Sequence, residues 1–151
     1  MKKEILDNVA YDLFTTLPLI HRSIRNKLIK NVITNIKEDI APPHFEIMKL
    51  LENTGMLHVA EIGERLQIAR PQMTHLIDRL VELELVERET NEEDRRMLNI
   101  RLTDDGKTFI KKRDKQVIDA TREVLSGLTD EELQELSVSL KNLKAIFLKL
   151  D

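Results

Sequence analysis

The chain has 151 residues, of which 41% are hydrophobic and 34% charged, a composition that fits one soluble, helix-rich domain and excludes a disordered chain. It contains no cysteine, which excludes disulfides, thiolate metal sites and thiol-based redox sensing. Its net charge of −3 counts against nucleic-acid binding through overall charge, so a DNA-facing surface would have to be local.

The N-terminal half begins with one long predicted helix over residues 4–36, in which Pro18 is an interruption. Apolar residues recur along it at three- and four-residue steps: Leu13, Leu17, Ile20, Ile24 and Leu28. Five basic residues and no acidic residue lie between Leu13 and Lys37. The apolar stripe continues through Ile33, so one small partner helix would not cover it.

Three shorter helices are predicted next. Pro42 and Pro43 begin a helix that buries Phe45, Met48 and Leu51 and ends at Gly55. After an extended segment over 56–59, a short helix over 60–67 turns Ile62 and Leu66 inward. A brief connection leads to a helix over 71–83, whose apolar stripe is Met73, Leu76, Ile77, Leu80 and Leu83.

The period of the pattern then changes to two. Leu98, Ile100 and Leu102 alternate with polar residues, which predicts a strand, and residues 85–90 supply an antiparallel partner. We therefore expect a β-hairpin with its tip at about 91–96, anchored by Leu98 and Ile100.

Two helices close the chain. Thr103 caps a helix that runs to about Ser126 and is ended by Gly127, and Thr129 with Glu132 forms a capping box for the last helix. The apolar stripe of that last helix is Leu133, Leu136, Leu140, Leu143, Phe147 and Leu150. The first and last helices each carry more apolar surface than the middle of the chain covers, which predicts that they pack together and against a second copy.

The predicted fold class is mainly α with a small β-hairpin wing: a winged helix-turn-helix with N- and C-terminal dimerisation helices. We expect a single domain over 1–151. Its DNA-binding part would span about 40–103, and its dimerisation helices would span about 4–36 and 104–150.

The candidate DNA-reading face lies on the helix over 71–83. With its apolar stripe inward, Pro71 and His75 point outward, Gln72, Thr74 and Arg79 flank them, and Arg70 lies at the helix start. Such side chains donate hydrogen bonds to base edges or phosphates in the major groove. The alternative is an ordinary polar helix face, which the acidic Asp78 and Glu82 favour.

The hairpin tip carries Arg95 and Arg96. A guanidinium at the end of a thin hairpin fits a narrow minor groove, where the negative potential is strongest. The alternative is a solvated turn in which Glu92, Glu93 and Asp94 merely neutralise the arginines. Glu92 and Glu93 weaken the positive field at the tip under either interpretation.

The stretches HVAEIGERLQIARPQMTHLIDRLVELELVERE (58–89) and DRRMLNIRLTDDG (94–106) resemble those of MarR-family transcriptional regulators. Positions that match the second family pattern are Asp94, Arg96, Leu102, Thr103 and Gly106. The resemblance implies a homodimer that binds pseudo-palindromic double-stranded DNA, usually as a repressor, and that many members release on binding a small phenolic or anionic effector. It also implies that Arg96 enters the minor groove and that Asp94 braces it through a salt bridge.

The remaining sites are less defined. His21 and Arg25 border the apolar stripe of the first helix, where an anionic or aromatic effector would meet a cation beside an apolar wall; pairing with another helix is the alternative. The four histidines lack metal-ligand spacing, and no catalytic signature or cofactor motif is present, so we expect no metal, no cofactor and no enzyme. Turnover dependent on His21 or His75 would revive an enzyme.

Two further expectations concern the cellular location of the protein and its binding partner. No apolar run approaches a membrane span and the N-terminus lacks the apolar core of a signal peptide, so we expect a cytoplasmic protein with no membrane partner. The alternative to DNA binding is a winged-helix module that uses its hairpin for protein contact. Binding to random duplex DNA separates the two.

Overall fold

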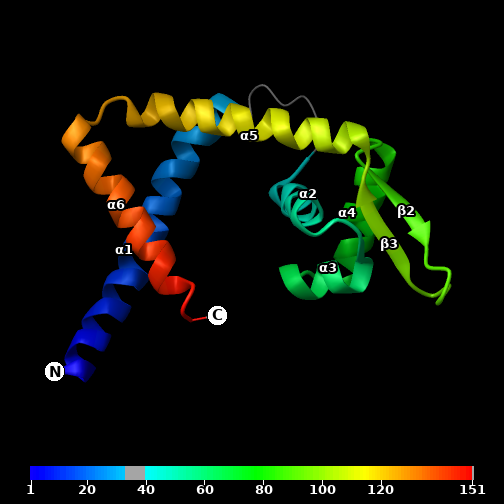
Figure 1. The fold of residues 1–151 in the computed structure, drawn as a ribbon, viewed down its shortest axis with the longest axis horizontal. Helices are drawn as coiled ribbons and strands as arrows, with labels where there is room; N and C mark the ends of the chain where they lie inside the picture. Colours follow the sequence, from blue (N-terminus) through cyan, green and yellow to red (C-terminus); the bar gives the residue numbers. More distant parts are fainter. Residues whose placement is uncertain (33–39, 151) are drawn as a thin grey trace. The chain divides into compact units, whose positions relative to one another are not determined.

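The computed structural model describes residues 1–32 and 40–150, with side chains omitted for 28–32. The chain divides into two compact units: Lys37–Lys115, and Met1–Ile36 together with Gln116–Asp151. The first of these is called the head below. Figure 1 shows the elements in chain order.

The elements follow the predicted order. They are α1 (Lys2–Val32), α2 (Pro42–Thr54), β1 (Leu57–His58), α3 (Val59–Leu66), α4 (Arg70–Glu82), β2 (Val86–Thr90), β3 (Leu98–Leu102), α5 (Asp104–Leu125) and α6 (Asp130–Phe147). The predicted boundaries are within about two residues wherever the chain is described, and Pro18 lies inside α1. The predicted end of the first helix, 33–36, lies outside the described residues.

The head is built around the inner faces of α2, α3 and α4. Fully buried side chains come from every one of these helices, including Ile47, Met48, Ile62, Ile77 and Leu80. Leu66 and Leu83, expected inward, are half-buried because they lie at or just beyond the ends of their helices. The apolar periodicity thus predicted the core of the head.

The turn between α3 and α4 is tight. Gln67 adopts a left-handed conformation with φ of 53°, and the Ile68 N–H donates to the Gly63 carbonyl over 2.8 Å. A Cβ on Gly63 would lie 3.1 Å from both the Ile68 carbonyl oxygen and Met73 Cγ. A glycine therefore lets the two helices approach closely at this turn.

The wing is a three-stranded antiparallel sheet in the order β1-β3-β2. Val86 pairs with Leu102 and Thr90 with Leu98, so the hairpin forms between the two segments that were predicted to pair. One detail was wrong: Leu98 is 42% exposed, whereas Asn99 is buried. The short β1 pairs only with Asn99 and Ile100, so it covers Asn99 and leaves Leu98 beyond its end.

The start of α5 is fixed to the head by the Leu-Thr-x-x-Gly motif. Thr103 Oγ1 donates to the Glu84 carbonyl over 2.6 Å and accepts the Gly106 N–H over 2.9 Å, which confirms the predicted cap. A Cβ on Gly106 would overlap the Leu85 carbonyl oxygen. The motif therefore holds α5 against the turn that separates α4 from β2.

Aromatic packing continues this attachment between α2 and α5. The Phe45 and Phe109 rings stack with centroids 6.0 Å apart, and the Arg113 guanidinium lies over the Phe45 ring. Burial lowers the pKa of Arg113 to about 10, so the side chain stays cationic at neutral pH. Lys49 also pairs with Asp114 over 2.6 Å. The head thus includes the first turns of α5.

The terminal helices differ from the head. In α6, the predicted capping box forms: Glu132 N–H donates to Thr129 Oγ1 over 3.2 Å, and Thr129 N–H donates to Glu132 Oε2 over 2.9 Å. No residue of α6 is buried. Large apolar side chains are exposed on both α1 and α6, among them Phe14 at 80%, Leu140 at 56% and Phe147 at 42%.

Candidate nucleic-acid interface

The first part of the candidate interface is the outer face of α4. Met73, Leu76, Ile77 and Leu80 are buried against the head, as predicted. The side chains predicted to face DNA lie on the exposed side, with Arg70 at the first position of the helix: Arg70, Pro71, Gln72, Thr74 and His75. The first two turns of α4 therefore present a polar surface with one cation at its start.

Arg79 lies on the flank of α4 rather than on its outermost face. Its side chain is 35% exposed, and its Nη1 pairs with Glu82 Oε2 over 3.2 Å. The helix thus holds Arg79 beside its own carboxylate. Thr74 Oγ1 donates to the Arg70 carbonyl over 3.3 Å, a contact typical of a hydroxyl inside a helix.

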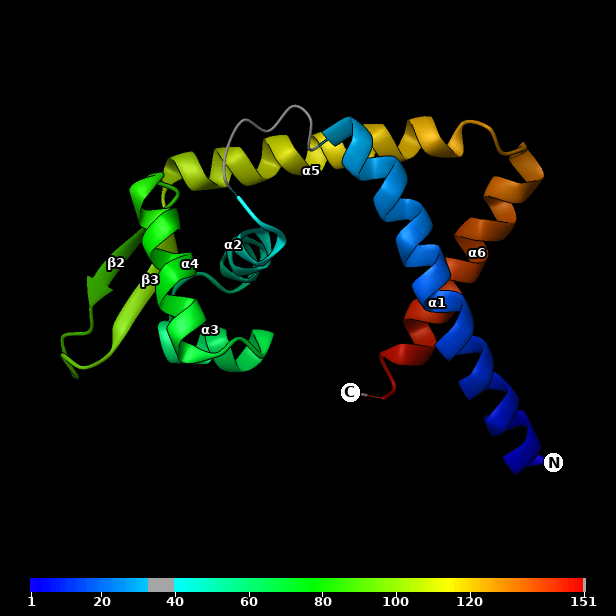
Figure 2. The ribbon, with the colours of Figure 1, turned by 180° about the vertical axis from the view of Figure 1, so that it is seen from behind.

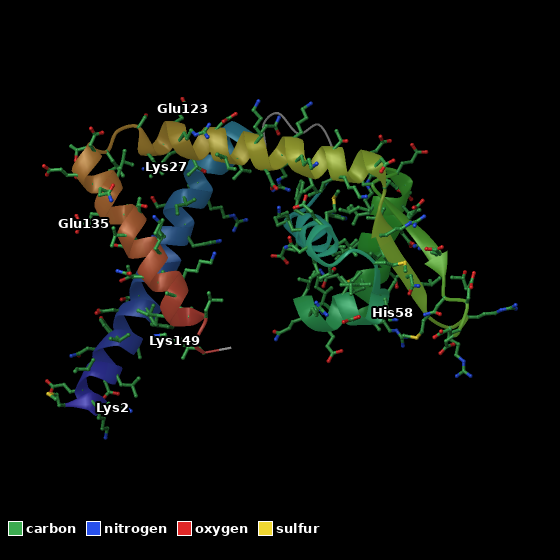
Figure 3. The ribbon with its side chains drawn as sticks, in the orientation of Figure 1. Lys2, Lys27, His58, Glu123, Glu135 and Lys149 are labelled. Atoms are coloured by element: carbon green, nitrogen blue, oxygen red, sulfur yellow. The ribbon has the colours of Figure 1, made fainter. Side chains whose placement is uncertain are left out.

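The second part is the hairpin tip, which projects away from the helices of the head (Figures 1 and 2). Asn91 Oδ1 accepts the Glu93 N–H over 2.9 Å, and the Met97 N–H donates to the Asp94 carbonyl over 3.0 Å. These bonds give the loop a defined path. Side chains extend outward from the tip on all sides (Figure 3).

Asp94 contacts Arg96 differently from the expected salt bridge. Asp94 Oδ1 accepts the backbone N–H of Arg96 over 3.0 Å, and no ion pair joins their side chains in the described chain. Asp94 therefore orders the backbone that carries Arg96 and leaves the guanidinium unengaged. Both Arg95 and Arg96 are exposed.

The fold brings the start of α4 and the hairpin tip to one cleft. Arg70, Thr74 and Arg96 all line this cleft of about 790 Å³, whose apolar wall includes Met73 and Met97. His58, labelled in Figure 3, contributes to the same lining from β1. Two segments predicted separately to contact DNA thus share one side of the head.

The predicted effector residues do not belong to the head. His21 and Arg25 are exposed on α1, in the other unit of the chain. No group of three or more histidine, aspartate or glutamate side chains suited to a metal occurs among the residues that the structure describes.

A short helix, a tight turn, a second helix with an exposed outer face and a paired hairpin together define a winged helix-turn-helix protein. The sequence model of the MarR family matches residues 40–98. The HTH-type transcriptional regulator YsmB of Bacillus subtilis (strain 168) is 29% identical over 139 residues, covering 86% of this chain and 95% of that protein.

Two further comparisons agree. The HTH-type transcriptional repressor MdtR of the same organism is 28% identical, covering 66% of this chain and 63% of the repressor. A solved structure of a MarR family protein from Bacillus stearothermophilus superposes with a TM-score of 0.74 at 25% identity, covering 93% and 96% of the two chains. Residues 40–98, which lie within the head, therefore match the MarR family of winged helix-turn-helix transcriptional regulators.

Proposed function

We propose that this protein regulates transcription by binding specific sequences in double-stranded DNA through α4 and the hairpin. The observation that carries this proposal is the shared cleft, in which cations from the start of α4 and from the hairpin tip lie on one side of the head. The N-terminal part of a recognition helix makes the base contacts in this class of protein, and that part of α4 is the exposed, polar one.

The roles divide between the two elements. Gln72, His75 and Thr74 read base edges in the major groove, while Arg70 and Arg79 lie where phosphates pass. Arg96 enters the flanking minor groove on a backbone ordered by Asp94, and Arg95 contacts phosphate.

The binding species is a homodimer, in which α1 and α6 pack against the same helices of a second copy. The exposed apolar side chains of these helices support it, because such surface is unfavourable in water. Two recognition helices would then enter successive major grooves about 34–36 Å apart on a pseudo-palindromic site.

Regulation would involve α1 rather than the DNA-binding head. The protein is a cytoplasmic repressor, released when a small aromatic or anionic effector binds next to His21 and Arg25 on α1. The effector acts by binding one arrangement of the two heads more tightly than the other. The name of the relative MdtR supports repression. No helix of the described chain has the length and apolarity to cross a membrane. We assign no catalytic role.

The acidic tip favours one alternative function. Glu92 and Glu93 are exposed beside the two arginines, and a hairpin of mixed charge also suits contact with a protein. In that case the winged helix would be an interaction module that does not bind DNA.

The deciding experiment measures binding to random duplex DNA at low and moderate salt. A DNA-binding protein loses affinity with rising salt, with a slope of about −0.9 for each phosphate neutralised. Arg96→Ala should weaken binding to all sequences without changing dimerisation. Gln72→Ala or His75→Ala should change sequence preference. Absence of binding at low salt would favour the interaction module.

A further inference from the structure

Both carboxylates on α4 are paired with arginines. The Asp78 carboxylate pairs with the Arg88 guanidinium, which comes from β2. Glu82 pairs with Arg79 within the helix itself. The acidic residues that argued against a DNA-reading helix are therefore neutralised, and Asp78 is neutralised by a residue of the wing.

The register of the hairpin explains why Arg88 reaches α4. Arg88 is aligned with Ile100, which is fully buried, so this position faces the helices of the head. Side chains alternate along a strand, so the neighbouring Glu87 lies on the opposite face, where it pairs with Arg101 over 2.5 Å. In the views of Figures 1 and 2, α4 lies against the hairpin.

We infer that Arg88 is a positioning residue for DNA binding: it acts through Asp78, whose negative charge it cancels on the recognition helix. This inference rests on the proposed function. A lone carboxylate on a helix that enters the groove would repel phosphates, because like charges brought together at an interface oppose binding. The pair leaves that part of α4 without net charge.

The solvent exposure of the Arg88–Asp78 pair indicates whether its loss affects folding stability or DNA binding. The side chains of Arg88 and Asp78 are 37% and 49% exposed, and ion pairs that solvent reaches contribute little to folding stability. DNA binding, rather than folding, should therefore respond to its loss.

The test compares Arg88→Gln, Asp78→Asn and the double variant in the whole 151-residue chain, with random duplex DNA as the probe. Arg101→Gln is the matched control, since it removes the same charge from the same hairpin on the opposite face. Arg88→Gln should weaken binding about tenfold more than Arg101→Gln, because it uncovers the Asp78 carboxylate. Asp78→Asn should bind as well as wild type or better, and the double variant should recover most of the lost affinity.

Three results would overturn the inference. If Arg88 contacts phosphate directly, the double variant stays weak and the salt slope falls by about 0.9. If the pair only holds the fold, Asp78→Asn weakens binding as much as Arg88→Gln does, and both lower the melting temperature. If the wild-type protein does not bind DNA, the proposed function itself is wrong. Wild-type binding is therefore measured before the variants are compared.

Discussion

The head and the terminal helices differ in how far their apolar side chains are buried. In the head, α2, α3 and α4 bury side chains that are inaccessible to water, and ion pairs join the hairpin to α4 and the start of α5 to α2. In α6, no side chain is buried, although its apolar stripe is as regular as that of α2. The same apolar spacing therefore predicts a helix in both regions. Whether the apolar stripe of that helix is buried depends on the elements that pack against it.

The largest effect is expected at the centre of the head. Ile47 is fully buried on α2, so Ile47→Ala should lower the free energy of unfolding by about 2–5 kcal/mol through lost contacts and a cavity. Urea denaturation measures the change. Glu46→Ala, exposed on the same helix, is the control and should stay within about 0.5 kcal/mol of wild type. Equal effects of the two substitutions would contradict the core described for the head.

The terminal helices should respond in association rather than in folding. Leu143→Asp in α6 would place a charge in the predicted dimer interface and should weaken dimerisation by about a hundredfold or more. Sedimentation over a range of concentrations measures this. Lys141→Glu, on the exposed surface of the same helix, is the control. A stable wild-type monomer at micromolar concentration would refute the predicted dimer.

The attachment of α5 to the head gives an intermediate effect. Gly106→Ala should destabilise the protein by about 1–3 kcal/mol, because the added methyl group overlaps the Leu85 carbonyl oxygen. Gly127→Ala is the matched control, since a Cβ there meets nothing within 4 Å. The two melting temperatures separate close packing from the general effect of replacing a glycine. A neutral Gly106→Ala would show that this contact is not needed.

The smallest effect concerns pH. His44 is buried in α2, and its Nδ1 accepts the Ala41 N–H over 2.9 Å, which requires that nitrogen to be unprotonated. Burial lowers the pKa of His44 below its ordinary value of 6.5, and the positive charge of Arg79 acts in the same direction. Just below pH 6.5, His44 therefore binds a proton more readily in the unfolded chain than in the folded chain.

Stability should consequently be complete above pH 6.5 and decline as the pH falls through that value, by at most about 1.4 kcal/mol per pH unit. His44→Asn keeps an acceptor for the Ala41 N–H and should remove this part of the pH dependence. Denaturation at pH 7.5 and 5.5 for both proteins measures it. An unchanged difference between the two pH values in the variant would show that another group is responsible.

Sequence patterns predicted the elements of the head because its helices and hairpin follow local rules. The stripe of α4, the capping Thr103 and the two strands of the hairpin all follow from residue spacing and cap chemistry. The burial of Asn99 and the exposure of Leu98 could not be predicted in this way. They depend on β1, a two-residue strand from a distant part of the chain.

The candidate site was predictable to a similar extent. Spacing placed Gln72, Thr74 and His75 on the exposed face of α4, but it did not show that Arg79 is held by Glu82. Arg88 was given no role in the predicted site, although it lies in the stretch that resembles MarR-family regulators. The available signal was its position in the hairpin, opposite Ile100, which puts a cation on the side of the strand that faces the head. Its partner Asp78 becomes evident only once α4 and β2 are packed together.

Selection of bound sequences from a random pool of duplex DNA tests the central claim most directly. We predict that the 151-residue chain enriches a pseudo-palindrome whose half-sites lie about one helical turn apart, or a multiple of it. It also predicts that His75→Ala or Gln72→Ala alters the enriched half-site. Failure to enrich any sequence at low salt would contradict the assignment of α4 and the hairpin as a DNA-reading surface.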